Sequence, residues 1–137
     1  MKKSHIIIIL ALAAVAVVAA AVLIVPQVFS AMKLQQNKQQ WEQIMIEDSL
    51  SYLEQNAEDF NPKKWSFAGL RAEGKSEAAE THNAENPDDF RYPYLKTQIS
   101  FREKSNPSSK ARWVVYYEIN EELDQIITGF EFVKDNG

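Results

Sequence analysis

The chain has 137 residues, 45% of them hydrophobic and 25% charged, which is the composition of a globular protein of one domain's length. Cysteine is absent, which excludes disulfide scaffolds, zinc sites with cysteine ligands and cysteine nucleophiles. Residues 27–137 hold 13 basic and 19 acidic residues, a net charge of −6. This charge opposes binding to nucleic acid phosphates, so no nucleic-acid partner is expected.

The N-terminus pairs a short basic tail, residues 1–5, with an uncharged apolar run of 20 residues, 6–25. A helix of that length spans about 30 Å, the thickness of a bilayer's hydrocarbon core. We therefore expect residues 6–25 to form a transmembrane helix, with the lipid bilayer as a partner. Lys2 and Lys3 favour a cytoplasmic N-terminus, so the chain is expected in the cell membrane, single-pass, with its C-terminal domain extracytoplasmic.

The same run also allows a second interpretation, a cleaved signal peptide. Such peptides have a basic start, a shorter apolar region and small residues before the cut. Pro26 interrupts the run, and Val28-Phe29-Ser30-Ala31 offers a cleavage site after Ser30. In that case the product is a small secreted protein.

After the apolar run the sequence predicts a polar juxtamembrane helix or flexible stalk, residues 26–40, followed by an amphipathic helix, residues 41–60. Apolar residues spaced three and four apart form one stripe, and three further residues widen it; Asn61-Pro62 then ends the helix. The stripe consists of Ile46, Leu50, Leu53, Ala57 and Phe60, and the wider face adds Trp41, Ile44 and Tyr52.

Four segments after the helix have the features of strands, at residues 65–72, 94–102, 112–119 and 125–133. In the second, Leu95, Thr97, Ile99 and Phe101 alternate with Tyr94, Lys96, Gln98 and Ser100. In the third, Trp113, Val115, Tyr117 and Ile119 alternate with Val114, Tyr116 and Glu118. In the fourth, Ile126, Thr128, Phe130 and Phe132 share one face.

The connections decide the topology. Residues 103–110 have the composition of a hairpin loop and residues 120–124 that of a turn, both too short for a helical crossover. Residues 73–89 are acidic and lack periodicity, which predicts a flexible acidic loop. The expected fold class is α+β: the amphipathic helix packs on a roughly four-stranded antiparallel meander, and the domain spans residues 41–137.

The sequence offers no catalytic constellation. His82 stands in the predicted loop without a neighbouring nucleophile motif, so no catalytic residue is assigned and the chain is not expected to be an enzyme. The acids around His82 could ligate a cation, but neither Asp-x-Asp-x-Asp-Gly nor His-Glu-x-x-His occurs, so we interpret them as solvated charges. These candidate ligands are Glu77, Glu80, His82, Glu85, Asp88 and Asp89. No metal site and no cofactor are expected.

A binding surface is indicated on the sheet face away from the helix. Tyrosine together with arginine or lysine is typical of surfaces that bind proteins or sugars, although exposed strands also carry tyrosine for strand propensity alone. The candidate binding residues are Tyr92, Tyr94, Lys96, Arg112 and Tyr116.

Two families share features with the chain. The run Phe101-Arg102-Glu103-Lys104, Pro107 and Trp113-Val114-Val115-Tyr116-Tyr117, after an N-terminal span and a helix, resembles small single-pass Gram-positive membrane proteins of unknown function. That resemblance covers the last third of the chain and implies no activity. The order of basic head, apolar helix, amphipathic helix and antiparallel meander resembles type IV pilin-like subunits. Such subunits carry a Gly-Phe junction that a dedicated peptidase cuts, and a glutamate five residues into the mature helix. The head of this chain instead reads Ser4-His5-Ile6, and no acid precedes Glu42.

The sequence thus predicts a membrane-anchored extracytoplasmic binding module, non-catalytic, whose partner is an envelope protein. A pilin-like or other self-assembling structural subunit, and a secreted small protein released after Ser30, are the alternatives.

Overall fold

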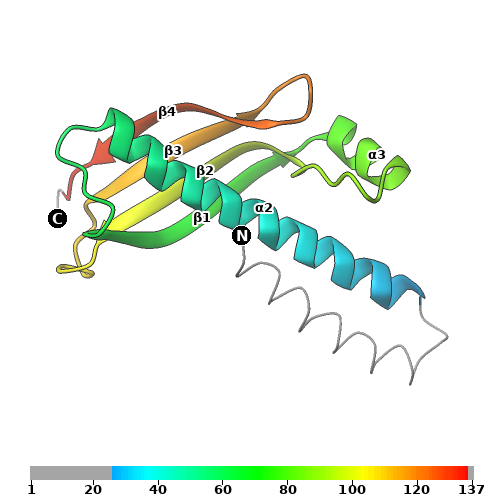
Figure 1. Cartoon of the computed structure of the whole chain (residues 1–137), viewed down its shortest axis with the longest axis horizontal. Helices are drawn as coiled ribbons and strands as arrows, with labels where there is room; N and C mark the ends of the chain where they lie inside the picture. The colour runs from blue at the N-terminus through cyan, green and yellow to red at the C-terminus, as the bar shows by residue number, and fades with distance from the viewer. Residues whose placement is uncertain (1–25, 136–137) are drawn as a thin grey trace. The chain divides into compact units, whose positions relative to one another are not determined.

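The computed structural model describes residues 26–135, with side chains from residue 33 (Figure 1). The predicted tail 1–5 and transmembrane helix 6–25 lie outside the described residues, as do the side chains around the cleavage site after Ser30. Between residues 26 and 135, no helix has both the length and the apolar character needed to cross a bilayer.

The described chain has an α+β architecture, a helix followed by a four-stranded antiparallel meander, as predicted. The strands pair in chain order, so every connection joins neighbours. The elements are α2 (Pro26–Asn56), β1 (Trp65–Lys75), α3 (Glu77–Glu85), β2 (Tyr94–Glu103), β3 (Arg112–Ile119) and β4 (Gln125–Val133).

The chain divides into two units, residues 1–43 and 44–137, and the boundary falls within α2. In the first unit, residues 26–43 are helical. Of the two forms predicted for residues 26–40, a helix or a flexible stalk, the structure has the helix. The second unit, hereafter the sheet unit, contains the rest of α2, α3 and the whole sheet.

The sheet-facing side of α2 differs from the predicted stripe. Met45, Ser49 and Leu53, spaced four apart, are its buried residues, whereas Ile46 and Leu50 are only half-buried. Ile44 is 42% exposed, so its assignment to the buried face is wrong. The buried face is centred on Ser49. The hydrophobic pattern did not identify this face, because serine is polar. Its hydroxyl is satisfied by the carbonyl O of Met45 at 2.7 Å and the phenol of Tyr117 at 2.8 Å.

Helix α2 ends at Asn56, four residues before the predicted end. The chain turns over Ala57–Phe60, where Asp59 adopts a left-handed backbone with φ 62°. Ala57 and Phe60 are nevertheless buried, because the turn folds them back onto the core.

The central strands alternate as predicted. Thr97, Ile99 and Phe101 in β2 and Val115 and Tyr117 in β3 are buried. The register pairs Ile99 with Val115 and Thr97 with Tyr117, so these side chains form the sheet's contribution to the core.

The alternation predicted for β4 is wrong because the strand contains a bulge. Gly129 lies opposite Tyr116 and Ile127 opposite Tyr117, which leaves Thr128 as the extra residue. Phe130 and Phe132 remain on the core face, where both rings contact Trp113. Ile126 is shifted to the other face, opposite Glu118, and is 45% exposed.

The prediction of a loop over residues 73–89 is also wrong. Strand β1 continues to Lys75, and Glu77–Glu85 form α3. Ser76 is the N-cap of this helix, since its Oγ accepts a hydrogen bond from the amide of Ala79 at 3.2 Å. Glu77 and Glu80 in the first turn complement the positive end of the helix dipole.

Candidate binding surface

The register places Lys96, Arg112 and Tyr116 on the face of the sheet that α2 does not cover, hereafter the open face. On β2, Lys96 and Gln98 alternate with the buried Thr97 and Ile99. Gln98 pairs with Tyr116 on β3, and Arg112 lies four residues before Tyr116 along that strand. These positions agree with the predicted surface.

Tyr92 does not belong to this surface. It lies in the segment before β2 and is fully buried, with 0% of its area exposed. Its ring lies 5.0 Å from that of Tyr94, and the Gln125 side-chain amide donates to the backbone carbonyl oxygens of both tyrosines. The prediction that Tyr92 lies on the exposed sheet face is wrong, because the segment before β2 is held by Gln125 and buries the ring. A folded α3 instead leads into a tightly bonded segment.

Tyr94 marks the border of the open face. It is the first residue of β2 and pairs with Lys75, and its side chain is half-buried against Tyr92. It therefore contributes more to the packing next to α3 than to an exposed surface.

Tyr116 is bonded to its own sheet. Its hydroxyl donates a hydrogen bond to the carboxylate of Glu131 on β4. That bond raises the pKa of Tyr116 above its usual value, together with partial burial and the negative charge of Glu131, while Arg112 acts in the opposite direction. The phenol therefore stays protonated at neutral pH and orients the Glu131 carboxylate across the open face.

The bases near α3 are matched by acids. Lys96 lies opposite Glu118, with Nζ 3.8 Å from the carboxylate, and Arg71 Nε lies 2.8 Å from Glu73. Both pairs are solvent-exposed, so each adds little to stability. Their effect is to make this half of the open face polar and nearly neutral.

Arg102 was missed by the sequence analysis. It lies on the open face directly opposite Arg112. The sequence does indicate that Arg102 and Arg112 are close, because any hairpin over residues 103–110 brings the ends of its two strands together. Strand periodicity assigns a face to each arginine but does not assign its cross-strand neighbour.

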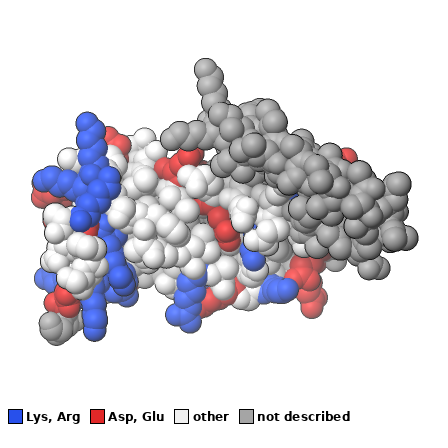
Figure 2. All heavy atoms as spheres, turned by 90° about the horizontal axis from the view of Figure 1, so that it is seen from below, with Lys and Arg blue, Asp and Glu red and all other residues white. Residues whose placement is uncertain are grey.

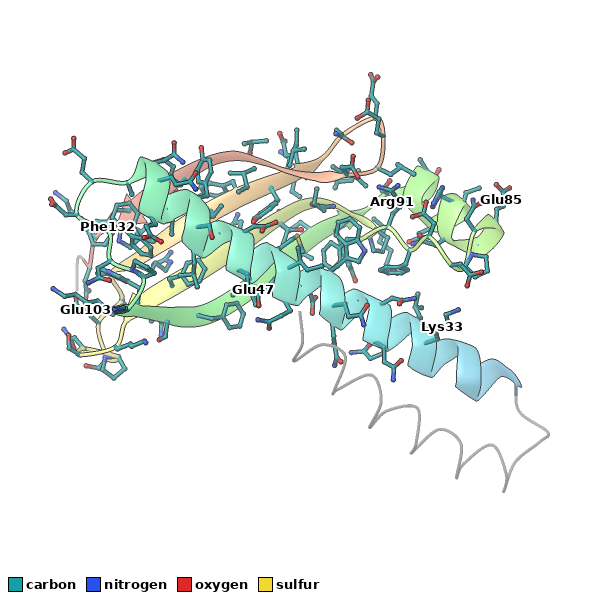
Figure 3. All side chains as sticks on the ribbon, viewed as in Figure 1. Lys33, Glu47, Glu85, Arg91, Glu103 and Phe132 are labelled. Carbon is teal, nitrogen blue, oxygen red and sulfur yellow. The ribbon has the colours of Figure 1, made fainter. Side chains whose placement is uncertain are left out.

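His82 has a structural environment in α3. Its Nε2 lies 2.9 Å from the backbone carbonyl oxygen of Asp89 and 3.0 Å from an Asp89 carboxylate oxygen. Arg91 continues the network, since its Nη2 lies 3.4 Å from the same Asp89 oxygen and its Nη1 lies 2.5 Å from Asp124 in the β3–β4 turn. Figure 3 shows Arg91 at this end of the sheet, next to α3. These contacts fasten α3 to the turn.

The acids around His82 do not converge. Over residues 26–135 no grouping of three or more His, Asp or Glu side chains has the geometry to hold a metal ion. Helix α3 separates the candidate ligands, because Glu77, Glu80 and Glu85 are exposed along its length.

Comparison of the chain with protein-family models, curated proteins and solved structures finds no significant match.

Proposed function

We propose that the chain is a membrane-anchored extracytoplasmic binding module, non-catalytic, that holds a protein partner of the same envelope. The observation that carries this proposal is the open face, the side of the sheet opposite the one on which α2 packs through Met45 and Tyr52 (Figure 1). It carries Lys96, Gln98, Arg112 and Tyr116 on its two central strands. Tyrosine and arginine are the residues that protein interfaces enrich.

The location rests on the sequence of the N-terminus. The 20 uncharged residues 6–25 have the length of a single span, and Lys2 and Lys3 favour a cytoplasmic N-terminus. Retention of the full chain in the membrane fraction, with the sheet unit digested by protease added outside intact cells, is the expected result. A shortened product that begins at Ala31 in the medium would instead favour the secreted alternative.

The binding role is tested by a photo-crosslinking amino acid introduced at Gln98 of the full chain in intact cells. We expect a discrete protein adduct from the half-buried Gln98 and none from Glu54, an exposed control position on α2. Equal adducts from both positions, or none from either, would contradict a binding role for the open face.

Two further measurements separate the alternatives. A binding module gives a monomer or a hetero-complex in native mass measurements from non-ionic detergent, whereas a self-assembling subunit gives a ladder of copies. Hydrolysis of a generic ester, peptide or glycan by the purified chain, abolished by His82→Ala, would show that it is an enzyme.

A further inference from the structure

Charge is distributed unevenly along the strands of the sheet unit, and basic side chains gather at one end. Figure 2 shows lysine and arginine side chains gathered at the left end, which in Figure 1 carries the β2–β3 hairpin. Figure 3 labels Glu103 and Phe132 at that end and Arg91 and Glu85 at the other. We define the basic end by Lys63, Lys64, Arg102, Lys104, Lys110 and Arg112.

These six bases, like Lys134 directly after β4, lie outside ion-pair distance of any described carboxylate, whereas four other bases of the sheet unit are paired. Arg71, Lys75, Arg91 and Lys96 each lie within ion-pair distance of a carboxylate. None of the six makes an ion pair with a carboxylate of the described residues. Two carboxylates do lie at this end, those of Glu103 in the hairpin and of Asp135, which accepts a hydrogen bond from the Lys110 amide at 3.0 Å. They offset the positive charge of the basic end only in part, because, among the described residues, neither forms an ion pair with the six bases.

The pair Arg102 and Arg112 is the clearest case. The two residues lie directly opposite each other on neighbouring strands, a position where like charges repel. Arg112 Nη1 donates to the carbonyl oxygen of Lys110 at 3.1 Å, which occupies one of five guanidinium donors. Two adjacent guanidinium groups can each bind a carboxylate through paired hydrogen bonds, and an anion placed between them would remove the repulsion.

An aromatic cluster lies at the same end, on the core face beyond the end of α2. The ring of Trp113 lies 5.0 Å from that of Phe132 and 6.3 Å from that of Trp65. Phe132 is 41% exposed, and Phe67 on β1 is 47% exposed. These rings and the two arginines lie on opposite faces of the sheet, so a ligand on Arg102 and Arg112 meets Phe132 by passing round the edge strand β4.

The chain enters the sheet unit at the opposite end. The carbonyl oxygen of Met45 lies 2.8 Å from the phenol of Tyr117, near the last residues of β3, whereas Phe60 packs on Trp113 near its first. The basic end is thus the end remote from residue 44.

We propose that the basic end binds an acidic, partly apolar segment of the protein partner. Its carboxylates lie across Arg102 and Arg112 on the open face. Where the segment passes round the edge strand β4 to the core face, an apolar side chain packs on the exposed Phe132. This inference rests on the proposed function and names the chemistry of the partner. A long polyanion fits less well, because it would extend from this end towards α3, where Glu77, Glu80, Glu85 and Asp88 are exposed.

The test measures binding of a fluorescent peptide of repeating Glu-Leu-Glu-Phe to the full chain in phosphatidylcholine nanodiscs. We expect Arg102→Gln with Arg112→Gln to weaken the Kd about tenfold or more. Arg71→Gln with Lys75→Gln removes two bases that are ion-paired elsewhere on the sheet, and should change the Kd by about twofold or less. Higher salt should weaken binding to the wild-type chain.

Several results would overturn the proposal. These are equal losses in the two double variants, equal binding of a Gln-Leu-Gln-Phe peptide, and absence of peptide binding to the wild-type chain. Tighter binding of inorganic polyphosphate or of phosphatidylglycerol vesicles would assign the basic end to phosphate groups instead. A failed peptide assay combined with an adduct at Gln98 in cells would leave the proposed function intact and reject only the acidic segment.

A second readout is independent of the peptide. Because the two guanidinium groups repel each other in the unbound chain, Arg102→Gln alone should raise the midpoint of thermal unfolding. A lowered midpoint would show that Arg102 stabilises the unbound fold, and would remove the reason to place an anion there.

Discussion

Two hydroxyl groups share one carbonyl oxygen where α2 meets the sheet. Ser49 Oγ and the Tyr117 phenol both lie within hydrogen-bond distance of the Met45 carbonyl oxygen and 2.8 Å from each other. Each hydroxyl has one proton to donate. At least one of the two hydroxyls donates to the carbonyl oxygen, and the second donates either to that oxygen as well or to the first hydroxyl. The cluster fixes the position of α2 along β3, because a helix shifted by one turn would leave these buried groups without partners.

This environment gives the first prediction. Burial, with a smaller contribution from the charge of Asp48, raises the pKa of Tyr117 to about 12, although the Ser49 hydrogen bond acts in the opposite direction. In the unfolded chain the phenol titrates near 10, so between about pH 10 and pH 12 the unfolded state loses its proton first. The folded state should therefore lose about 2–3 kcal/mol of stability as the pH rises through this window.

Tyr117→Phe isolates that contribution. At neutral pH it should cost about 1 kcal/mol, because one buried hydrogen bond is lost while Ser49 still satisfies Met45. At high pH the difference between the two proteins should shrink and then reverse, since phenylalanine does not titrate. Urea unfolding followed by tryptophan fluorescence at several pH values measures this. A difference that is constant with pH would contradict the raised pKa.

Gly74 gives the second prediction. Its φ is +69°, and a Cβ atom there would lie 3.0 Å from Cδ1 of Leu95. Gly74→Ala should therefore destabilise the protein by about 1–2 kcal/mol. Gly69→Ala is the matched control on the same strand, because no atom lies within 4 Å of its added Cβ. Equal free energies of unfolding for the two variants would contradict the expected strain.

The residue scale also shows what periodicity can and cannot establish about the site. Alternation assigned Lys96, Tyr116 and Arg112 to the open face, because each lies in a strand whose other face is apolar. It could not show that Tyr92 is buried, since that residue precedes the strand and depends on a folded α3. It could not place Arg102 opposite Arg112, since that requires the register of the hairpin.

At the scale of elements, the sequence predicted those with an apolar pattern. Strands β2 and β3 pair without a bulge, and their register agrees with their predicted faces, although Val114 on the open face is buried as well. Strands β1 and β4 contain bulges near Ala68 and at Thr128, where one extra residue inverts the pattern. Helix α3 was missed because it contains only small apolar residues and one buried residue, Ala79. Its signals were an N-cap serine followed by alanine and glutamate, which favour helices.

The third prediction concerns this cap. Ser76→Ala removes the acceptor of the Ala79 amide and should cost about 1 kcal/mol. Because the lost bond lies in the first turn, hydrogen exchange of the amides of residues 77–80 should accelerate more than that of β3. Thr81→Ala, at an exposed position inside α3, is the control and should leave those amides protected. Equal acceleration in both variants would contradict a capping role for Ser76.

At the scale of the whole molecule, net charge gives an incomplete description of the surface. The value of −6 over residues 27–137 predicts a surface that repels anions. The fold instead gathers bases without acidic partners at one end of the sheet and pairs the bases near α3 with acids. The sum of charges cannot show this segregation, because it depends on which loops the meander brings together.

The last prediction concerns the boundary at residue 44. The buried apolar residues of the described chain all lie within residues 44–137; they include Met45, Leu53, Phe101 and Val115. Such a chain has roughly 90 residues, well above the length below which domains depend on disulfides or metals. We therefore expect residues 44–137, produced alone, to unfold in one cooperative transition, with the fluorescence of Trp65 and Trp113 reporting packed rings.

The comparison that decides this prediction is with the full chain in non-ionic detergent. Equal urea midpoints would show that the stability of the sheet resides in residues 44–137. A collapsed state without near-UV circular dichroism would show that residues before Ile44 are required for packing. Leu53→Ala in the shorter chain is the internal control: its side chain is fully buried, so its loss should cost about 2–5 kcal/mol if the native core has formed. A loosely packed core would register a much smaller loss, because it has no fixed cavity to leave empty.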